Sequence, residues 1–483
     1  KKCLSCIRST TCELQKLCME YGADEEHFSG KRDVRKIDDS SISIIRDPNK
    51  CILCRRCVAT CHNLQDIGAI GMQNRGFDTV VGCENGKTLA ETQCINCGQC
   101  IVACPVGALY ERDDTDRVFE AISDPAKHVV VCMAPSVRAT IGECFGYEPG
   151  TDTEGKLVAA AKRLGFDGVY DMNFTADLTI VEEANELIER IQNGGKLPMI
   201  TSCSPGWIKF CEHYYPDMTE NLSTCKSPQQ MFGAIYKTYY AKKMGYDPKD
   251  VFFVSCIPCT AKKFEVKRDN RNAAGVPDVD AAITTRELAR MIKRAGIDFR
   301  ALADEAYDLP IGIGSGAGAI FGATGGVMEA AIRTAADVIA HVPFEKIDVT
   351  PIRGTEGVKF ASYKLGDLTL NVAVASGTKN AKKLLNAVRR GEVDVQFIEV
   401  MACPGGCVNG GGQPTQPAVV RNNTDLAKIR AKVLYTADKD KLDVRRSHEN
   451  SVVKALYDEF LEKPGSHKAH EILHTTYVKR GLY

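Results

Sequence analysis

The residues of this chain that could do chemistry are mainly cysteines, and two of them lie in the glycine-rich stretch Phe397 to Pro414, FIEVMACPGGCVNGGGQP. Its apolar, β-branched start predicts a buried strand, so Cys403 and Cys407 would follow the end of that strand. Thiolates at such a position indicate a metal site. The five glycines lack a Cβ and tolerate positive φ, which lets the backbone approach a bulky ligand closely. The stretch therefore predicts an inorganic cluster; the alternative is a glycine-rich turn with two incidental core cysteines.

Two further runs of cysteines share the spacing C-x2-C-x2-C-x3-C. They consist of Cys51, Cys54, Cys57 and Cys61, and of Cys94, Cys97, Cys100 and Cys104. This repeat is typical of two-cluster bacterial ferredoxins, in which the fourth cysteine of each run ligates the other cluster. We therefore expect two four-iron clusters, or cubanes. One would be bound by Cys51, Cys54, Cys57 and Cys104, and the other by Cys94, Cys97, Cys100 and Cys61. His62 stands where proline is usual, which affects only the local turn.

An earlier cysteine segment, KKCLSCIRSTTCELQKLC, contains Cys3, Cys6, Cys12 and Cys18. Three or four thiolates this close in sequence can hold a single iron–sulfur or zinc centre, and the spacing leaves both open. In total the chain has 22 cysteines. That is too many for an ordinary cytosolic protein, in which disulfides are rare, and the short spacings suit cluster ligation better than a disulfide framework.

Composition sets the broad class. A chain of 483 residues with 44% hydrophobic residues is long enough for two to four globular domains. Lys plus Arg equal Asp plus Glu at 62 each, so no global field would recruit nucleic acid or an anionic membrane. No apolar run reaches the roughly 18 residues of a membrane span, and no signal peptide is evident. We expect a cytoplasmic protein. The chain starts without Met, so we expect an upstream segment.

The predicted secondary structure that must position these residues changes after about Ser123. Apolar, β-rich runs alternate with helical patterns there, at 128–136, 197–207, 250–259, 368–377 and 395–403. Such runs indicate mostly parallel sheets covered on both faces, with ligands at the carboxyl ends of the strands. Cys203, Cys259, Cys403 and Cys407 would then converge on one buried site. We expect an α+β and α/β chain with a cluster segment at 1–35, a two-cluster ferredoxin-like domain at 36–122 and a large α/β active-site domain at 123–483.

Three motifs together carry a family resemblance: TSCSPGW (201–207), IPCTAKKFE (257–265) and EVMACPGGCVNGGGQP (399–414). They resemble the signature stretches of the iron-only, di-iron hydrogenases, of the type found in NAD(P)-linked multisubunit enzymes. The resemblance implies reversible H2 oxidation and proton reduction at an active-site cluster, the H-cluster, in which a cubane is linked to a di-iron unit with carbonyl, cyanide and a dithiolate. It also implies three further four-iron clusters as an electron relay.

The resemblance assigns roles around this cluster. Cys407 would bridge the cubane and the di-iron unit, with Cys259 and Cys403 as further ligands. Lys262 would donate a hydrogen bond to a cyanide, a charge-assisted contact. The other pocket residues carried over from the family are Pro135, Ser136, Gln229, Ile257, Phe321 and Met401. Ile257 stands where the family more usually has Met.

A proton path is also implied by the resemblance. Cys203 matches the family's proton-relaying thiol, and Glu183, Ser223, Glu186 and Arg190 match the path behind it. Glu183, Glu186 and Arg190 fall on one helical stripe. The pattern alone favours a plainer interpretation, a solvated face with an i,i+4 pair between Glu186 and Arg190.

One ligand of the active-site cubane departs from the family pattern. Where the family usually has a second cysteine beside the relay thiol, this chain has Ser204. The fourth ligand would be Ser204, Cys203 or Cys225, and we favour Cys225 because soft iron prefers sulfur and Cys225 is close in sequence to Ser223 and Gln229. For the first cluster, the family's fourth ligand is a His just before the run, so here the candidates are Cys18 and a residue upstream of Lys1.

Two functions of different class follow. One is a hydrogenase catalytic subunit, and the other is a non-catalytic relative for iron–sulfur assembly or for H2 or redox sensing. The intact motif around Cys403 and Cys407, together with Cys203, favours the first. No flavin or dinucleotide fingerprint is present, so we expect ferredoxin or flavin- and NAD(P)-binding partner subunits. The family also implies a two-iron cluster in an upstream segment.

Overall fold

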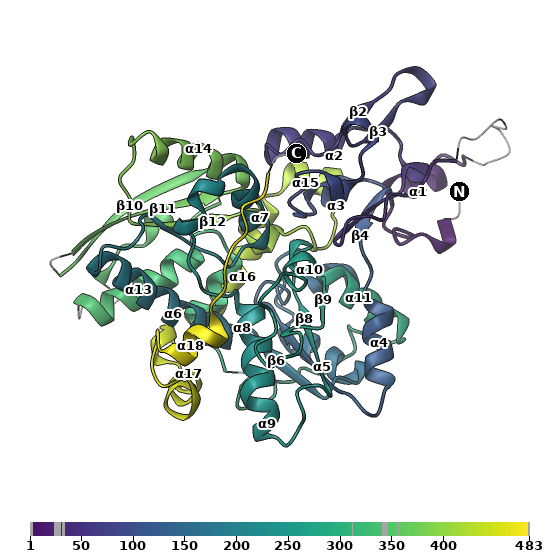
Figure 1. The fold of residues 1–483 in the computed structure, drawn as a ribbon. Coiled ribbons are helices and arrows are strands. Elements are labelled where there is room, and N and C mark those ends of the chain that lie inside the picture. Colours follow the sequence, from purple (N-terminus) through teal and green to yellow (C-terminus); the bar gives the residue numbers. More distant parts are fainter. Residues whose placement is uncertain are drawn as a thin grey trace.

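The computed structural model describes residues 3–23, 30, 34–311, 313–340, 346–355, 357–366 and 368–481. Lys1 and part of the predicted cluster segment 1–35 lie outside the described residues. Figure 1 shows a small N-terminal part, coloured purple to blue, beside a much larger α/β part.

The N-terminal part consists of short elements around the two cysteine runs. They are α1 (Glu13–Glu20), β1 (Ile44–Arg46), α2 (Arg56–Ala59), β2 (Gly71–Gln73), β3 (Val80–Gly82), α3 (Gln99–Ala103) and β4 (Leu109–Glu111). β1 pairs antiparallel with β4, and β2 with β3. Because β1 precedes the first run and β4 follows the second, their pairing closes the segment into the predicted ferredoxin-like unit.

The two cysteine runs adopt the same backbone conformation. Leu53 and Arg55 have φ angles of 56° and 63°, and the equivalent Asn96 and Gly98 have 58° and 69°. Three of these are not glycine, although L residues rarely adopt this left-handed region. The fold therefore imposes the conformation at both runs. At position 98 glycine is needed for space, since a Cβ there would lie 2.4 Å from Thr260 Oγ1.

The larger part contains two separate four-stranded sheets. The first has the order β6-β5-β8-β9 and is parallel throughout; its strands are β5 (His128–Met133), β6 (Gly168–Asp171), β8 (Val251–Cys256) and β9 (Ala281–Ile283). The second has the order β10-β11-β12-β7, formed by β7 (Met199–Ile200), β10 (Val358–Leu365), β11 (Leu368–Ser376) and β12 (Phe397–Met401). Only β10 is antiparallel to its neighbour. The predicted mostly parallel α/β architecture is confirmed.

The predicted strand at 197–207 is mostly wrong. Only Met199 and Ile200 lie in β7, and the chain leaves the sheet at Thr201. Pro205 then starts helix α7 (Pro205–Tyr214), where its fixed φ suits a first helical position. The apolar pattern continues into α7 because that helix is itself buried, so the pattern hides the change from strand to helix.

Both faces of the second sheet are covered, as the continuous apolar strands predict. Along β12, Phe397 and Met401 face a core shared with α6 (Asn173–Gln192) and α13 (Gly326–Ala340), whereas Ile398 and Val400 face a core shared with α7 and α14 (Thr378–Arg389). Glu399 is also buried in this strand. Its carboxylate accepts the backbone N–H groups of Gly325 and Met328 at 2.6 and 2.8 Å, so it caps the start of α13.

Helix α6 joins the two halves of the larger part. Phe174 and Leu178 pack in the core of the first sheet, and Ala176 and Ile180 pack in that of the second. The first sheet packs also against α5 (Glu154–Leu164), α8 (Pro228–Ile235) and α11 (Thr285–Arg294). The remaining helices are α4 (Thr115–Ser123), α9 (Ala241–Lys243), α10 (Ala261–Glu265), α12 (Gly316–Ala319), α15 (Ala418–Asn423), α16 (Leu426–Asp440), α17 (Ser451–Leu456) and α18 (His467–Leu473).

The end of the chain packs back on the larger part. Helix α17 continues through a wider helical turn at Tyr457–Leu461 and stops before Pro464 and Gly465. After α18 the chain runs extended along α7 (Figure 1), where His213 Nδ1 lies 2.7 Å from the Gly481 carbonyl. None of the helices in the described residues is long and apolar enough to span a membrane. The expected cytoplasmic location stays a prediction.

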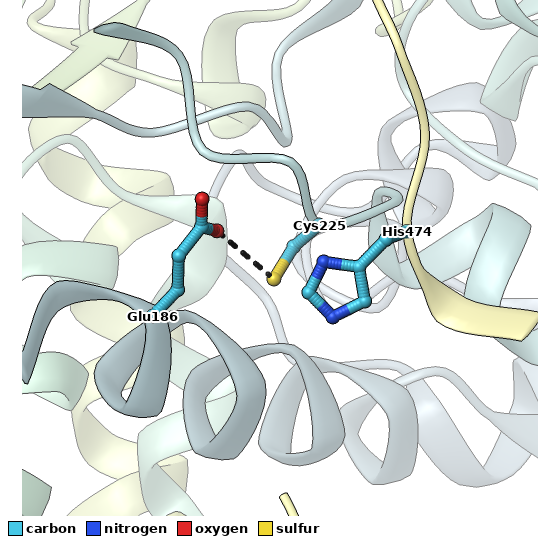
Figure 2. A group of neighbouring side chains, drawn as sticks. All are labelled: Glu186, Cys225 and His474. Atoms are coloured by element: carbon cyan, nitrogen blue, oxygen red, sulfur yellow. Dashed lines mark hydrogen bonds between the residues drawn. The ribbon is translucent and has the colours of Figure 1, made fainter. Parts of the chain in front are cut away.

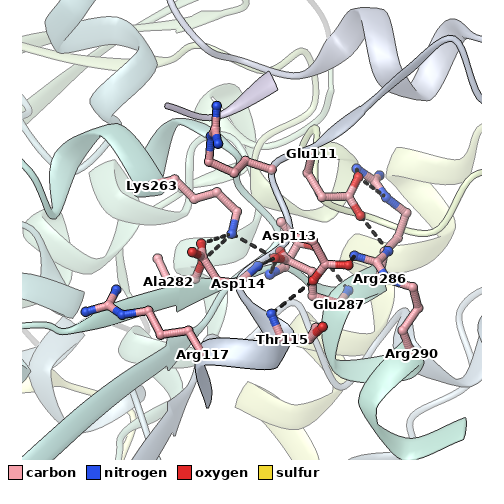
Figure 3. Close-up of polar contacts among 12 residues, drawn as sticks. Glu111, Asp113, Asp114, Thr115, Arg117, Lys263, Ala282, Arg286, Glu287 and Arg290 are labelled. Atoms are coloured by element: carbon pink, nitrogen blue, oxygen red, sulfur yellow. Dashed lines mark hydrogen bonds and ion pairs between the residues drawn. The ribbon is translucent and has the colours of Figure 1, made fainter. Parts of the chain in front are cut away.

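An ion-pair network fixes the N-terminal part against the larger part (Figure 3). Glu111, at the end of β4, accepts hydrogen bonds from Arg286 at 2.6 Å and from Arg290 at 2.7 Å, both on α11. Lys263 of α10 pairs with Asp114 and with Glu287. Although burial alone would raise the pKa of Glu111, the two guanidinium groups hold it below its ordinary value. Glu111 is therefore ionised, and the two parts are joined by charge-assisted bonds.

Candidate active site

A cavity with an empty volume of about 810 Å³ lies where strands of both sheets end. Residues after β5, β7, β8 and β12 form its walls, so one site collects chain segments that are far apart in sequence. The residues of our predicted site that line it are Pro135, Ser136, Cys203, Ser204, Gln229, Ile257, Cys259, Lys262, Phe321, Met401, Cys403 and Cys407. This is the position at which open α/β sheets bind ligands.

The cysteines of this cavity have donor properties that fit a metal cluster. Burial raises the pKa of Cys407 to about 12, and it raises the pKa of Cys403 and Cys259 as well. Thiols in such surroundings stay protonated unless a cation replaces the proton. Three convergent thiols around an apolar cavity thus suit a group that supplies several positive metal ions.

The glycines of the 397–414 stretch serve a purpose that we did not predict for them. A Cβ on Gly410 would lie 2.1 Å from the Pro258 carbonyl oxygen, and one on Gly411 would lie 2.0 Å from the Cys97 carbonyl oxygen. The cysteine loop thus packs backbone against backbone on two neighbouring loops. Gly406, with φ of 94°, and Gly410 also line the cavity. The glycines are needed at least as much for this packing as for space around a cluster.

Polar groups at one wall of the cavity are held by an ordered network. Lys262 Nζ donates to the Cys203 carbonyl at 3.1 Å and to Glu265 Oε2 at 2.9 Å. Gln229 donates to the same carboxylate oxygen at 2.7 Å and accepts from Ser255 Oγ at 2.6 Å. These bonds use two of the three donor hydrogens of Lys262 and one of the two of Gln229.

Ser136 completes the donor set of this wall. It is fully buried, and in the described structure its Oγ has no hydrogen-bond partner. A buried hydroxyl without a partner is costly, so its presence beside the cavity fits a bound group that accepts hydrogen bonds. Lys262, Gln229 and Ser136 together could satisfy small ligands with lone pairs, such as cyanide.

Among the predicted proton-path residues, Glu183, Glu186 and Ser223 are buried and Arg190 is half-buried; the Glu183 carboxylate oxygens have no hydrogen-bond partner among the described residues. Ser223 Oγ donates to Glu186 Oε2 at 2.9 Å, and Arg190 Nη2 donates to Glu186 Oε1 at 2.6 Å. Glu183 is 1% exposed and Glu186 8%, so the plainer interpretation as a solvated face is wrong, although its Glu186–Arg190 pair is present. Burial, with the Glu186 carboxylate nearby, raises the pKa of Glu183 to about 8. Burial, and then the nearby Glu183 carboxylate, raise the pKa of Cys203.

Cys225 does not lie where we expected it. It is buried, but it does not line the cavity; its Sγ donates to Glu186 Oε2 at 3.8 Å on the α6 side (Figure 2). The Cys225 carbonyl accepts from Ser202 Oγ at 2.7 Å, which fixes the strand-like segment with the thiol turned away from the cavity. Gln229, four residues further along the chain and in α8, does line the cavity. Sequence proximity to Gln229 and Ser223 was therefore misleading.

Ser204, in contrast, does line the cavity. Its Oγ accepts from the Ala402 backbone N–H at 3.3 Å, next to Cys403. Cys203 lines the cavity as well. Of the three candidates for the fourth cubane ligand, the structure thus brings Ser204 and Cys203 to the site and leaves Cys225 outside it.

Two smaller cavities collect the cysteines of the ferredoxin-like runs. One, of about 430 Å³, is lined by Cys51, Cys54, Cys57 and Cys104; the other, of about 440 Å³, is lined by Cys61, Cys94, Cys97 and Cys100. Each therefore takes three cysteines from one run and one from the other, as expected. Cys97 also lines the large cavity, a contact that its motif gave no sign of.

The first cysteine segment lies against the ferredoxin-like part. Cys12 packs on its core, and Cys6 Sγ is so close to Gly107 that a Cβ there would lie 2.8 Å away. Cys3 is exposed, and Cys18 lies in α1. The fourth ligand of a cluster here stays open between Cys18 and a residue upstream of Lys1.

Comparison with known families identifies the chain. The model described as iron only hydrogenase large subunit, C-terminal domain, matches residues 127–411. The chain belongs to the iron-only hydrogenases. Two more models match this hydrogenase: a 4Fe-4S dicluster domain at residues 50–108 and an iron hydrogenase small subunit at residues 424–480. It is thus an oxidoreductase that acts on H2, and the predicted family, fold class and enzyme class are confirmed.

Individual relatives agree. The hydrogenase is 48% identical to the NADP-reducing hydrogenase subunit HndD of Solidesulfovibrio fructosivorans over 486 residues, 99% of this chain and 82% of that protein. It is also 48% identical to iron hydrogenase 1 of Clostridium pasteurianum over 479 residues, 99% of this chain and 83% of that one.

A solved structure also supports the assignment. A variant of the apo [FeFe]-hydrogenase HydA1 from Chlamydomonas reinhardtii matches 77% of this chain and 100% of its own at 40% identity, with a TM-score of 0.68. A cytosolic Fe-S cluster assembly factor of Xenopus tropicalis is more distant, at 29% identity over 80% of this chain and 82% of that protein. The hydrogenase function is therefore favoured over the non-catalytic alternative.

Proposed function

We propose that this hydrogenase binds its active-site cluster in the 810 Å³ cavity through Cys259, Cys403 and Cys407, with the fourth cubane position at Ser204 or Cys203. The convergence of these thiols from separate strand ends on one cavity is the observation that carries the proposal. When bound, the cluster supplies the metal ions at which H2 is split or formed. Serine is the harder donor, so a cubane held by Ser204 would be more difficult to reduce than one held by sulfur alone.

The residues around the cluster would hold and shield it. Lys262, Gln229 and Ser136 would donate hydrogen bonds to its small anionic ligands, and the ion pair between Lys262 and Glu265 at 2.9 Å fixes the ammonium in place. Ile257, Phe321 and Met401 would form the apolar wall that excludes bulk water. The low dielectric would strengthen every charge-assisted contact in the cavity.

Protons would travel between the surface and the cavity along Arg190, Glu186, Ser223, Glu183 and Cys203. With its pKa raised to about 8, Glu183 holds a proton at neutral pH and can release it without a large cost. The Ser223 hydroxyl can donate and accept in one step, and it already donates to Glu186 at 2.9 Å. Cys203 would carry the proton into the cavity.

Electrons would travel through three four-iron clusters in the N-terminal part. Their ligands would be Cys3, Cys6 and Cys12 for the first, and the interleaved sets of the two smaller cavities for the others. Because Cys97 lines both the 440 Å³ cavity and the large cavity, the cluster of the second run would be the one that exchanges electrons with the active site. The 48% identity to an NADP-reducing hydrogenase subunit supports ferredoxin or flavin- and NAD(P)-binding subunits as the electron partners. A two-iron cluster upstream of Lys1 would belong to the same relay.

Infrared spectroscopy of the anaerobically purified holoenzyme tests the proposal, since carbonyl and cyanide ligands absorb where protein does not. We expect their bands, with about sixteen cubane irons and two more per chain, at four irons in each cubane. An iron content near eight, enough for only two cubanes, together with an absence of those bands, would overturn it and favour the assembly or sensing relative.

A further inference from the structure

One buried side-chain amide of the ferredoxin-like part has N–H groups that nothing in the described structure accepts. Gln65 is 1% exposed and lines the 440 Å³ cavity of the second cysteine run. Its Nε2 has no hydrogen-bond partner among the described residues. A buried N–H group without an acceptor is costly, so folded proteins nearly always supply one. We therefore expect the acceptor of this amide in the cavity that it lines.

Gln65 is held in place by the larger part of the molecule. Thr378, the first residue of α14, is fully buried, and its Oγ1 lies 2.6 Å from the Gln65 backbone carbonyl oxygen and 2.8 Å from Gln65 Oε1. We assign the amide oxygen to the Thr378 side, because the reverse orientation would turn its lone pairs toward the cysteine sulfurs. The N–H groups are thus left for an acceptor in the cavity.

The other polar side chains that line this cavity are already engaged. Gln99 Nε2 donates to the Asn409 carbonyl at 2.8 Å. Thr60 uses its hydroxyl hydrogen on the Arg56 carbonyl at 2.9 Å. Gln65 is therefore the lining residue whose amide nitrogen has both hydrogens to offer.

The two ferredoxin-like cavities also differ in charge. The 430 Å³ cavity is lined in part by the charged residues Arg46, Asp47 and Arg55. None of the described residues that line the 440 Å³ cavity is an acid, a Lys, an Arg or a His. The reduction potential of an iron–sulfur cluster depends on nearby charge, on hydrogen bonds to its sulfurs and on exposure to solvent. With an uncharged lining, a hydrogen bond from Gln65 would carry more of that dependence in the second cavity.

Cys97 links Gln65 to the active site. Burial raises the pKa of Cys97 to about 12, and the Gln99 backbone N–H and the Gln65 side chain oppose that rise, so both donors lie near its sulfur. Cys97 also lines the large cavity. A donor at this sulfur therefore acts where electrons would pass between the second cysteine run and the active site.

We propose that the Gln65 side-chain amide donates a hydrogen bond to the sulfur atoms of the second-run cluster and thereby raises the reduction potential of that cluster. This role rests on the proposed electron relay. Reduction adds one electron, and with it negative charge on the sulfurs, so a hydrogen-bond donor stabilises the reduced form more than the oxidised form. The amide keeps its protons throughout. Gln65 would thus help this cluster to accept the electrons that H2 oxidation releases.

Gln65→Met tests the hydrogen bond, because methionine has a similar length and no donor. Electron paramagnetic resonance of the anaerobic holoenzyme during a reductive titration measures the midpoint potentials of the cubanes. At the parental midpoint of the second-run cluster, its ratio of reduced to oxidised form should fall at least about threefold in the variant. That is a shift of about 28 mV, since one electron gives about 59 mV per tenfold.

Gln93→Met is the matched control. Gln93 lies between the two cysteine runs, donates to the Ile67 carbonyl at 3.4 Å and does not line the cavity. All midpoints should stay parental in this variant. Parental midpoints in Gln65→Met with full iron content, or a shift to higher potential, would overturn the proposal.

Infrared spectroscopy assigns the shifted midpoint to the second run. Because Cys97 lines both cavities, an electron added beside it should change the electric field at the carbonyl and cyanide ligands and shift their bands. The potential at which the bands shift should move with Gln65→Met and not with Gln93→Met. A midpoint shift in Gln65→Met that leaves this potential unchanged would place the effect on another cluster and refute the assignment.

Thr378→Val decides the question if Gln65→Met loses iron. Thr378 does not line the cavity, so valine would remove the anchor of the amide without touching the cluster. The same midpoint should fall, by less than in Gln65→Met, and a parental midpoint would then overturn the role of Gln65. A parent without carbonyl and cyanide bands would overturn the proposed function instead, and the paramagnetic resonance titration would still decide the role of Gln65.

Discussion

Gln99 Nε2 donates a hydrogen bond to the Asn409 carbonyl oxygen at 2.8 Å. This bond joins the second ferredoxin-like run to the cysteine loop of the active site, two segments that lie far apart in the sequence. It lies beside a tight backbone contact between them, where Gly411 packs on the Cys97 carbonyl. The step by which electrons enter the cavity would thus cross a rigid contact and not a flexible linker.

Gly411→Ala should disturb this contact. Its Cβ would lie 2.0 Å from the Cys97 carbonyl oxygen, so one of the two loops must move, at a cost of about 1–3 kcal/mol of stability. H2-driven reduction of an external electron acceptor should slow more than H2/D⁺ exchange, which needs no external electrons. Gly71→Ala is the control, since the nearest atom to its Cβ would be 3.8 Å away. Equal slowing of both reactions would contradict the electron-entry assignment.

Cys203→Ala should lower H2 turnover by about 10²-fold or more, the usual contribution of a positioned proton carrier. Glu183→Gln should act in the same direction, because glutamine cannot release the proton that Glu183 holds. The iron content and the electron paramagnetic resonance of the N-terminal clusters should stay parental in both. Cys211→Ala serves as a matched buried-thiol control. Parental turnover in either Cys203→Ala or Glu183→Gln would disprove the route.

Stability should depend on pH through Glu183. Its pKa is raised to about 8 in the folded chain against about 4.3 when unfolded, so the folded state binds the extra proton between these values. The resulting stability is complete below about pH 4 and is lost as pH rises toward 8, by about 1.4 kcal/mol per unit. Between pH 6 and 8 the Tm of the parent should therefore fall relative to that of Glu183→Gln. Parallel Tm curves would show that Glu183 is not protonated at neutral pH.

Cys225→Ala should retain the active-site iron, whereas Ser204→Ala should lower it. The reason is position, because Ser204 lines the cavity and Cys225 does not. Iron and sulfide analysis and the carbonyl and cyanide infrared bands provide the measurement. If Cys225→Ala lost these bands and Ser204→Ala kept them, the sulfur of Cys225 would have to reach the cluster after all.

Glu111→Gln should weaken the contact between the N-terminal and larger parts by about 3–5 kcal/mol, because it leaves the largely buried guanidinium of Arg286 without its anion and leaves Arg290 with Asp113 alone. Faster proteolysis between β4 and α4 and a lower Tm would report the loss. Asp116→Asn is the matched control: it breaks an ion pair with Arg294 whose side chains are 77% and 62% exposed, which is worth about 0–1 kcal/mol. Equal effects of the two variants would argue against the network of Figure 3 as the main fixing contact.

Local patterns in the sequence predicted mostly parallel sheets and the convergence of cysteines on one site, whereas the other residues that line the cavity were assigned by the resemblance to the family. A cysteine motif carries its own geometry, so Cys51 and Cys104 could be assigned to one cavity from spacing alone. Contacts that depend on how distant segments pack could not be predicted. The thiol of Cys225 turns toward α6 because Ser202 holds its carbonyl, and Cys97 reaches the active-site cavity because Gly411 admits its backbone. Neither fact has a signature in the residues nearby.

The repeated backbone of the two cysteine runs has a consequence for how the metal is loaded. Leu53 and Arg55 match Asn96 and Gly98 in φ, so the segment is two copies of one half-unit. Each of the two cavities is lined by three cysteines of one half and one of the other. If cubanes occupy these cavities as proposed, their loading would be coupled, because each cubane would take ligands from both halves.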